Sequence, residues 1–174
     1  MASAVQPILE DLDRIIDEHA GRLEVRTLCE VADGSETFPV RSLCLGSASR
    51  DAPAIGFFGG VHGLERIGTQ VLVSFLASFL EQLRWDDQLE RQLAAVRLVF
   101  MPLVNPAGMS RRTRSNGNGV DLMRNAPVGS ATSSTATSRS FAALQASRRM
   151  YGRSAAPLRF MKVCGFTSRT RVPC

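Results

Sequence analysis

The chain has 174 residues, of which 44% are hydrophobic, and this is enough for one domain with a buried core. Its most apolar stretch, residues 67–80, is too short to span a bilayer. The first 20 residues lack a basic region and carry acidic residues between the apolar ones. We therefore expect no signal peptide, no membrane partner and a soluble, cytoplasmic protein.

The formal net charge of +5 is unevenly distributed. Residues 1–128 contain 13 Arg, no Lys and 16 Asp plus Glu, whereas residues 129–174 contain seven Arg, one Lys and no acidic residue. The second part also includes the low-complexity stretch GSATSSTATSRS. We expect a folded domain over residues 1–128 and, over residues 129–174, a basic, disordered or poorly folded C-terminal tail outside that domain.

Residues 6–20 predict an amphipathic helix, because one face collects Ile8, Leu12, Ile15, Ile16 and His19. Residues 22–47 predict two strands joined by a turn at the sequence DGS. Pro39 indicates an edge position in the second strand, since proline cannot donate a backbone hydrogen bond.

The next part of the chain predicts a buried strand over residues 52–60, helices over 66–83 and 86–95, and a second buried strand over 96–106. The longer helix has an apolar i, i+4 stripe that we expect to pack on the sheet: Ile67, Val71, Phe75, Phe79 and Leu83. Strand, helix, strand in this order predicts a parallel pair. Functional sites in such sheets lie at the carboxyl ends of the strands.

The four cysteines, Cys29, Cys44, Cys164 and Cys174, show no CxxC spacing. Without a predicted secretory signal they are expected to be free thiols. Cys29 and Cys44 fall in predicted strands, where cysteine behaves as a small hydrophobic residue.

A histidine and a glutamate follow the first buried strand in the sequence GGVHGLERIGTQ. His62 and Glu65 are three residues apart, so a turn entering a helix can point both side chains the same way. Imidazole and carboxylate are ordinary zinc ligands. From spacing alone a second interpretation stays open, in which His62 is a hydrogen-bonded loop residue and Glu65 a solvated carboxylate at a helix start.

The second buried strand leads into an arginine-rich loop, RRTRSNGNGVDLMRN over residues 111–125. Arginine binds carboxylates bidentately, and Asp121 could orient a metal-bound histidine. A basic surface loop is the simpler alternative. A third interpretation is that the loop contacts phosphate or nucleic acid. However, no aromatic residues lie between these arginines and residues 1–128 are net acidic, so we expect no nucleic-acid partner.

The chain resembles the zinc carboxypeptidases (M14 metallopeptidases) in three motifs taken together: GGVHGLE, NPAG and RTRSNGNGVDLMRN. Within this family it most resembles bacterial short-loop members that act on peptides or murein peptides. The resemblance covers roughly residues 53–127. It implies an α/β fold with a mixed, mainly parallel sheet flanked by helices, one catalytic zinc ion, and a peptide or peptide-like substrate.

Carried over by position, the resemblance implies that His62 and Glu65 are the first two zinc ligands. Asp121 corresponds to the partner of the histidine ligand. Arg114 corresponds to the arginine that polarises the scissile carbonyl, with Arg111 as the fallback for that role. In the same way, Arg124 and Asn125 correspond to substrate-binding residues, Arg124 gripping the terminal carboxylate.

The sequence also departs from the family pattern. Met123 stands where the family usually has asparagine, and methionine cannot donate a hydrogen bond to a carboxylate. No histidine follows His62 and no acidic residue follows Asp121, so the third zinc ligand and the glutamate base have no counterpart. We expect an incomplete carboxypeptidase-like domain, truncated before these residues; the alternatives are an inactive remnant, or an amidase- or deacylase-type zinc hydrolase of small amides.

Overall fold

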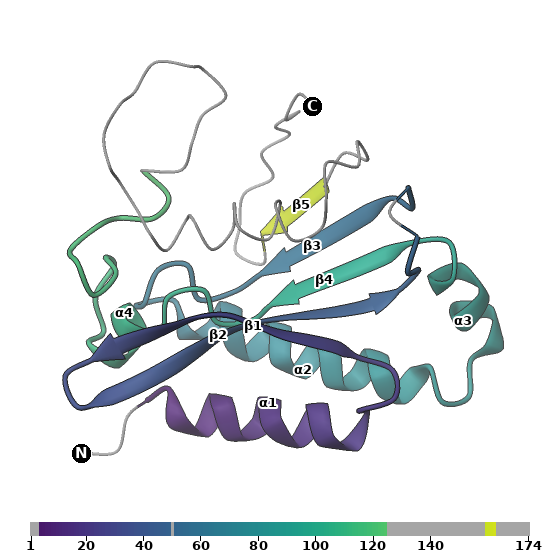
Figure 1. The fold of residues 1–174 in the computed structure, drawn as a ribbon, viewed down its shortest axis with the longest axis horizontal. Coiled ribbons are helices and arrows are strands. Elements are labelled where there is room, and N and C mark those ends of the chain that lie inside the picture. Colours follow the sequence, from purple (N-terminus) through teal and green to yellow (C-terminus); the bar gives the residue numbers. More distant parts are fainter. Residues whose placement is uncertain (1–3, 50, 125–158, 163–174) are drawn as a thin grey trace.

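The computed structural model describes residues 4–49, 51–124 and 159–162, which form one sheet with helices packed against it (Figure 1). The elements follow in chain order: α1 (Gln6–Glu18), β1 (Glu24–Asp33), β2 (Glu36–Gly46), β3 (Ala54–Phe58), α2 (Arg66–Gln82), α3 (Asp87–Leu93), β4 (Arg97–Met101), α4 (Pro106–Ser110) and β5 (Arg159–Lys162). The predicted helices and strands are all present; the short helix α4 and the strand β5, which lies in the predicted tail, were not predicted.

The strand order in the sheet is β1-β2-β4-β3-β5. β1 and β2 form the predicted antiparallel hairpin, which turns at Gly34, where a φ of 65° favours glycine. β2 is also antiparallel to β4, whereas β3 is parallel to both β4 and β5. The predicted mixed α/β sheet and the predicted parallel pair of β3 and β4 are therefore confirmed.

Pro39 lies in the half of β2 that has one neighbour among the described strands. It faces Glu30 of β1, while the pairing of β2 with β4 runs only from Leu43 to Gly46. The predicted edge position thus holds for this half of β2, where the missing N–H of proline leaves no ladder bond unmade.

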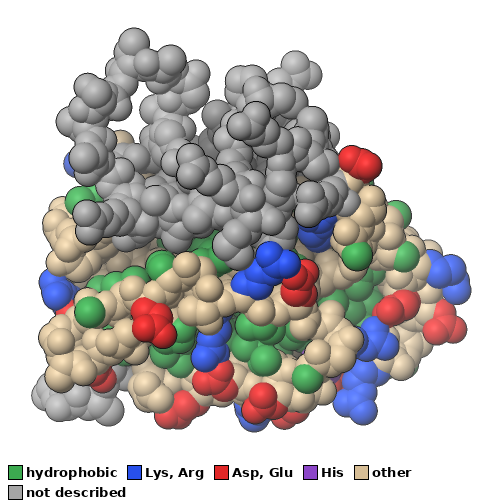
Figure 2. Space-filling view, in the orientation of Figure 1, with side chains coloured by type: hydrophobic (Ala, Val, Ile, Leu, Met, Phe, Trp, Pro, Cys, Tyr) green, Lys and Arg blue, Asp and Glu red, His purple; other side chains and the backbone are tan. Residues whose placement is uncertain are grey.

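The helix α1 confirms the predicted amphipathic helix. Its buried residues, Ile8, Leu9, Leu12 and Ile15, join α2 and the sheet in the larger hydrophobic core. On its outer side Arg14 pairs with Asp11 at 3.1 Å and with Glu18 at 3.7 Å. Figure 2 shows such charged side chains along the lower edge of the molecule, where Figure 1 places α1.

The helix α2 packs through only part of the predicted stripe: Leu83 and Phe79 join the core, and the ring of Phe75 lies 5.6 Å from that of Phe57 in β3 and 6.1 Å from that of Phe100 in β4. Ile67, Val71 and Phe75 are 72%, 48% and 42% exposed, while Leu83 is buried and Phe79 half-buried. The residues that α2 buries are Gly68, Thr69, Leu72, Val73, Leu76 and Leu80. The prediction that Ile67 and Val71 are buried is wrong, because α2 carries two apolar stripes and the other one is buried here. Close packing favours the stripe that contains Gly68 and Thr69. A Cβ atom added to Gly59, just after β3, would lie 3.1 Å from Thr69 Cα, so only a helix face of small residues can approach this strand end so closely.

Of residues 129–174 the structure describes only β5, whose backbone adds a strand beside β3 from Ile55 to Phe58. The rest of the predicted tail lies outside the described residues. None of the described helices is both long and apolar enough to cross a membrane.

Cys29 and Cys44 form no disulfide within the described part of the chain, as predicted, and Cys44 is buried. Burial raises the pKa of the Cys29 thiol, which favours its neutral form. Both therefore act as small apolar residues of the hairpin; Cys164 and Cys174 lie outside the described residues.

The two faces of α2 can be compared by truncation. Leu76 is fully buried, so Leu76→Ala is expected to lower the free energy of unfolding by about 2–5 kcal/mol. Ile67→Ala, on the exposed stripe, is expected to change it by no more than about 0.5 kcal/mol. Urea denaturation of both variants measures this difference, and equal losses would contradict the assignment of the buried face.

Candidate functional site

Two loops meet at the carboxyl ends of β3 and β4, because parallel strands end at the same edge of a sheet. Val104 N–H donates to Gly59 O at 3.0 Å and Asn105 N–H donates to Gly60 O at 2.9 Å. A Cβ on Gly59 would lie 2.6 Å from Pro102 O, and Gly60 has a φ of 59°. Glycines at both positions therefore let the loop after β3 lie directly on the chain leaving β4.

His62 and Glu65 face each other across this loop. His62 is 3% exposed, and its Nδ1 lies 2.8 Å from Glu65 Oε1. Its Nε2 is buried without a hydrogen bond and lies 3.5 Å from Asp121 Oδ1, on the loop after β4. The two ring nitrogens thus face two different carboxylates: Nδ1 is hydrogen-bonded to Glu65, and Nε2 faces Asp121.

The carboxylate of Asp121 connects the residues of the site. It accepts a hydrogen bond from Arg114 Nε at 2.7 Å, and Arg124 Nε lies 3.5 Å away. The hydrogen bond from Arg114 lowers the pKa of Asp121 from 3.8 to about 2; desolvation opposes this effect, and the backbone N–H groups of Arg124 and Met123 support it. Asp121 is therefore ionised at neutral pH and holds a negative charge beside the buried imidazole.

The structure brings together five of the predicted site residues, which are His62, Glu65, Arg114, Asp121 and Arg124. Arg111, the fallback for Arg114, donates instead to Asp33 of β1 at 2.6 Å and to Gly117 O at 3.1 Å. Asn125 lies outside the described residues. His19, which caps α1 at its C-terminal end, is buried with Nε2 3.5 Å from Glu81 of α2. Arg111 and Arg114 thus pair with different carboxylates, Asp33 and Asp121, and only the second of these faces His62.

Sequence reasoning missed two buried asparagines that organise these loops. Asn105 is 2% exposed and caps α4, and Asn116 is 7% exposed. Asn116 Oδ1 accepts the N–H groups of Asn118 and Val120, both at 3.0 Å, and so closes the turn in SNGNG. The signal was present in the sequence, because Asn before Pro predicts a helix cap and Asn-Gly predicts a turn.

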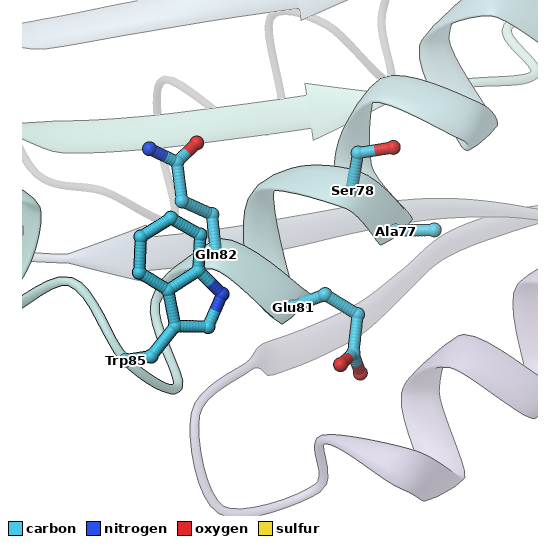
Figure 3. Close-up of a pocket in the computed structure, with 5 residues that line it drawn as sticks. All are labelled: Ala77, Ser78, Glu81, Gln82 and Trp85. Carbon is cyan, nitrogen blue, oxygen red and sulfur yellow. The ribbon is translucent and has the colours of Figure 1, made fainter.

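A shallow hollow lies over the C-terminal half of α2, lined by Ala77, Ser78, Glu81, Gln82 and Trp85 (Figure 3). Ala77 is twelve positions after Glu65, roughly 18 Å along a helix axis. None of the predicted site residues lines this hollow, so it is separate from the loops that carry His62 and Asp121.

The donor atoms at His62 and Glu65 suit zinc, which binds imidazole nitrogen and carboxylate oxygen. The orientation is also compatible with zinc, because the second nitrogen of a metal-bound histidine usually donates to a carboxylate, and His62 Nε2 faces Asp121 Oδ1 at 3.5 Å. Within the described part of the chain, however, no group of three or more His, Cys, Asp or Glu could hold a metal. His62 and Glu65 therefore fit two of the ligands of a zinc site, where a catalytic site uses three.

Comparison with known proteins agrees with this geometry. Residues 18–152 match the family described as zinc carboxypeptidase. The chain is 36% identical over 75 residues to carboxypeptidase SOL1 from Arabidopsis thaliana, which covers 43% of this chain and 15% of that protein. Because it spans so little of this relative, the match says nothing of the whole protein's activity.

Solved structures share the fold. A metallo-carboxypeptidase from Burkholderia cenocepacia aligns with a TM-score of 0.63 and 18% identity, over 88% of this chain and 38% of that one. Thrombin activatable fibrinolysis inhibitor aligns with a TM-score of 0.66 and 16% identity, over 91% of this chain and 46% of that one. The chain thus spans less than half the length of these two structures.

The low pKa of Asp121 predicts how stability depends on pH. Because the pKa is lowered to about 2 on folding, the stabilisation is complete above the ordinary value of 3.8 and is lost as the pH falls through about 2. Asp121→Asn should therefore be less stable than the parent at pH 6, and the difference should shrink between roughly pH 4 and pH 2. Urea denaturation across this range measures it, and a difference that does not change with pH would contradict the ionic role of Asp121.

Proposed function

Since the chain belongs to the zinc carboxypeptidase family, we propose that it carries the first part of a zinc-dependent peptidase centre in which His62 and Glu65 hold the metal. One observation carries the proposal: His62 Nδ1 and Glu65 Oε1 converge at 2.8 Å while His62 Nε2 faces Asp121. A hydrogen-bonded loop histidine would also account for the contact of Nδ1 with Glu65, but not for Nε2, which is buried beside Asp121 without a hydrogen bond.

Bound zinc would supply a Lewis acid that polarises the substrate carbonyl and makes water acidic. The residues of this chain have the supporting roles. Asp121 orients the His62 ring and keeps Nδ1 directed at the metal position. Arg114, which is half-exposed, stabilises the negative charge that develops on the carbonyl oxygen.

Substrate binding is assigned to the end of the same loop. The Arg124 side chain is 80% exposed, and its Nε lies 3.5 Å from Asp121. Its guanidinium is thus open to a terminal carboxylate close to the His62 loop. With Asn125, which lies outside the described residues, it would select peptides with a free C-terminus.

The third zinc ligand and the glutamate base are not among these 174 residues, since no histidine follows His62 and no acid follows Asp121. General-base catalysis contributes about 10²- to 10⁴-fold in such reactions. We infer that this chain by itself is weakly active or inactive.

A second candidate, hydrolysis of small amides, is favoured by Met123. This residue is 41% exposed beside Arg124, and its thioether cannot donate a hydrogen bond to a carboxylate. An amidase- or deacylase-type hydrolase would use the same zinc and Arg114 without requiring a terminal carboxylate.

Zinc binding tests the metal site. The purified chain is expected to bind Zn²⁺, His62→Ala to abolish the binding, and Asp121→Asn to weaken it about 10- to 100-fold because the ring loses its orienting partner. His19→Ala, which removes the other buried histidine, is the matched control and should bind like the parent. Calorimetric titration measures all four proteins. Absence of binding in the parent, or equal loss in His19→Ala, would contradict the proposal.

A pair of ligands separates the two candidate functions. An acetylated dipeptide is expected to bind more tightly than its C-terminal amide, and Arg124→Gln should remove this preference. The control is Arg84→Gln, another exposed arginine, which pairs with Glu81 on α2. NMR titration gives the affinities; equal binding of acid and amide to the parent would instead support the small-amide hydrolase.

A further inference from the structure

The side chain of Asn105 lies between the loop that carries His62 and the loop that carries Arg114. It is 2% exposed, at the start of α4. Its Nδ2 donates to Val61 O at 3.3 Å and to Ser115 O at 3.2 Å, and its Oδ1 accepts from Gly108 N at 2.9 Å. One amide group thus contacts three separate backbone segments.

The chemistry of this position is specific to a primary amide. The two hydrogens on Nδ2 serve two different carbonyl oxygens, and the side-chain oxygen satisfies an N–H at the start of a helix. Aspartate could accept from Gly108 but could not donate to either carbonyl. Serine could also cap the helix, but it is too short and has only one hydrogen to offer.

The segments that Asn105 joins are already in close backbone contact. A Cβ on Gly63, next to His62, would lie 1.9 Å from Gly108 C. A Cβ on Gly108 would lie 2.4 Å from Ser115 O, next to Arg114. The backbones leave no space for side chains here, and the Asn105 side chain adds its hydrogen bonds to the backbone ones that Gly59 O and Gly60 O accept.

We propose that Asn105 is a positioning residue, which fixes the loop of Arg114 and Asp121 relative to the loop of His62 and Glu65 by bridging Val61 O and Ser115 O. The link of this role to metal binding rests on the proposed function. The bridge itself does not, because it joins the two loops through the backbone carbonyls of Val61 and Ser115.

Two substitutions separate the bridge from the helix cap. Asn105→Ser keeps a capping oxygen and removes both bridging donors, whereas Asn105→Ala removes the cap as well. Two amides report on the loops: Glu65 N–H, which donates to His62 O at 3.0 Å, and Val120 N–H, which donates to Asn116 Oδ1 at 3.0 Å. In both variants we expect hydrogen exchange at these two amides to accelerate about tenfold.

In the same variants the dissociation constant for Zn²⁺ should rise about 10- to 100-fold. Asp86→Ala is the matched control, since it removes the cap of α3, where Asp86 accepts from Leu89 N at 2.9 Å. It should lower the melting temperature without changing exchange at Glu65 and Val120 or the affinity for Zn²⁺. If Asn105→Ser exchanges and binds Zn²⁺ like the parent, Asn105 is a helix cap only and the inference is overturned.

The parent protein provides a test that needs no variant. If Asn105 joins the loops, Glu65 N–H and Val120 N–H should exchange through one opening, with the same free energy and the same dependence on denaturant. Independent openings would overturn the inference even if both Asn105 variants fail to fold. A parent that binds no Zn²⁺ but shows one shared opening would remove the proposed function and leave the positioning role in place.

Discussion

The parallel pairing of β3 with β4 is the constraint on which the site depends. The register from Ala54–Arg97 to Phe58–Met101 makes the two strands end side by side, so the residues that follow them must share one edge of the sheet. Residues from positions 62–65 and 114–124 meet there although some 50 positions separate them in the chain. A shift in this register would separate His62 from Asp121 before any side chain changed.

Close contact at that edge is made possible by glycine and made specific by asparagine. Gly63 and Gly108 let backbone lie on backbone, which leaves carbonyl and N–H groups buried and in need of partners. Asn105 and Asn116 supply those partners from side chains that are themselves almost fully buried. The ionic residues then lie on a rigid base, and Asp121 connects the buried imidazole with two guanidinium groups at the surface.

The helix α2 shows how far periodicity can be used. Its limits could be predicted from apolar spacing, but of the stripe predicted to be buried Ile67 and Val71 are exposed, while Phe75, 42% exposed, contacts Phe57 and Phe100. Both stripes have helical spacing, so the pattern alone could not distinguish them. The buried face was selected by the close approach of Thr69 to Gly59, a contact between distant parts of the chain. The exposed stripe leaves α2 with apolar surface beyond what the described core uses.

The sequence by itself determined the elements, the hairpin turn and the parallel pair, because these follow from local spacing and residue chemistry. It proposed His62, Glu65, Asp121 and Arg114 as site residues only through the resemblance to the zinc carboxypeptidases. Only the tertiary structure decided that Arg111 pairs with Asp33 whereas Arg114 pairs with Asp121, and that Asn105 lies between the two loops. The reason is physical: periodicity and propensity act over a few residues, whereas the partner of a buried polar group is fixed by whichever distant backbone the packing brings within hydrogen-bond distance.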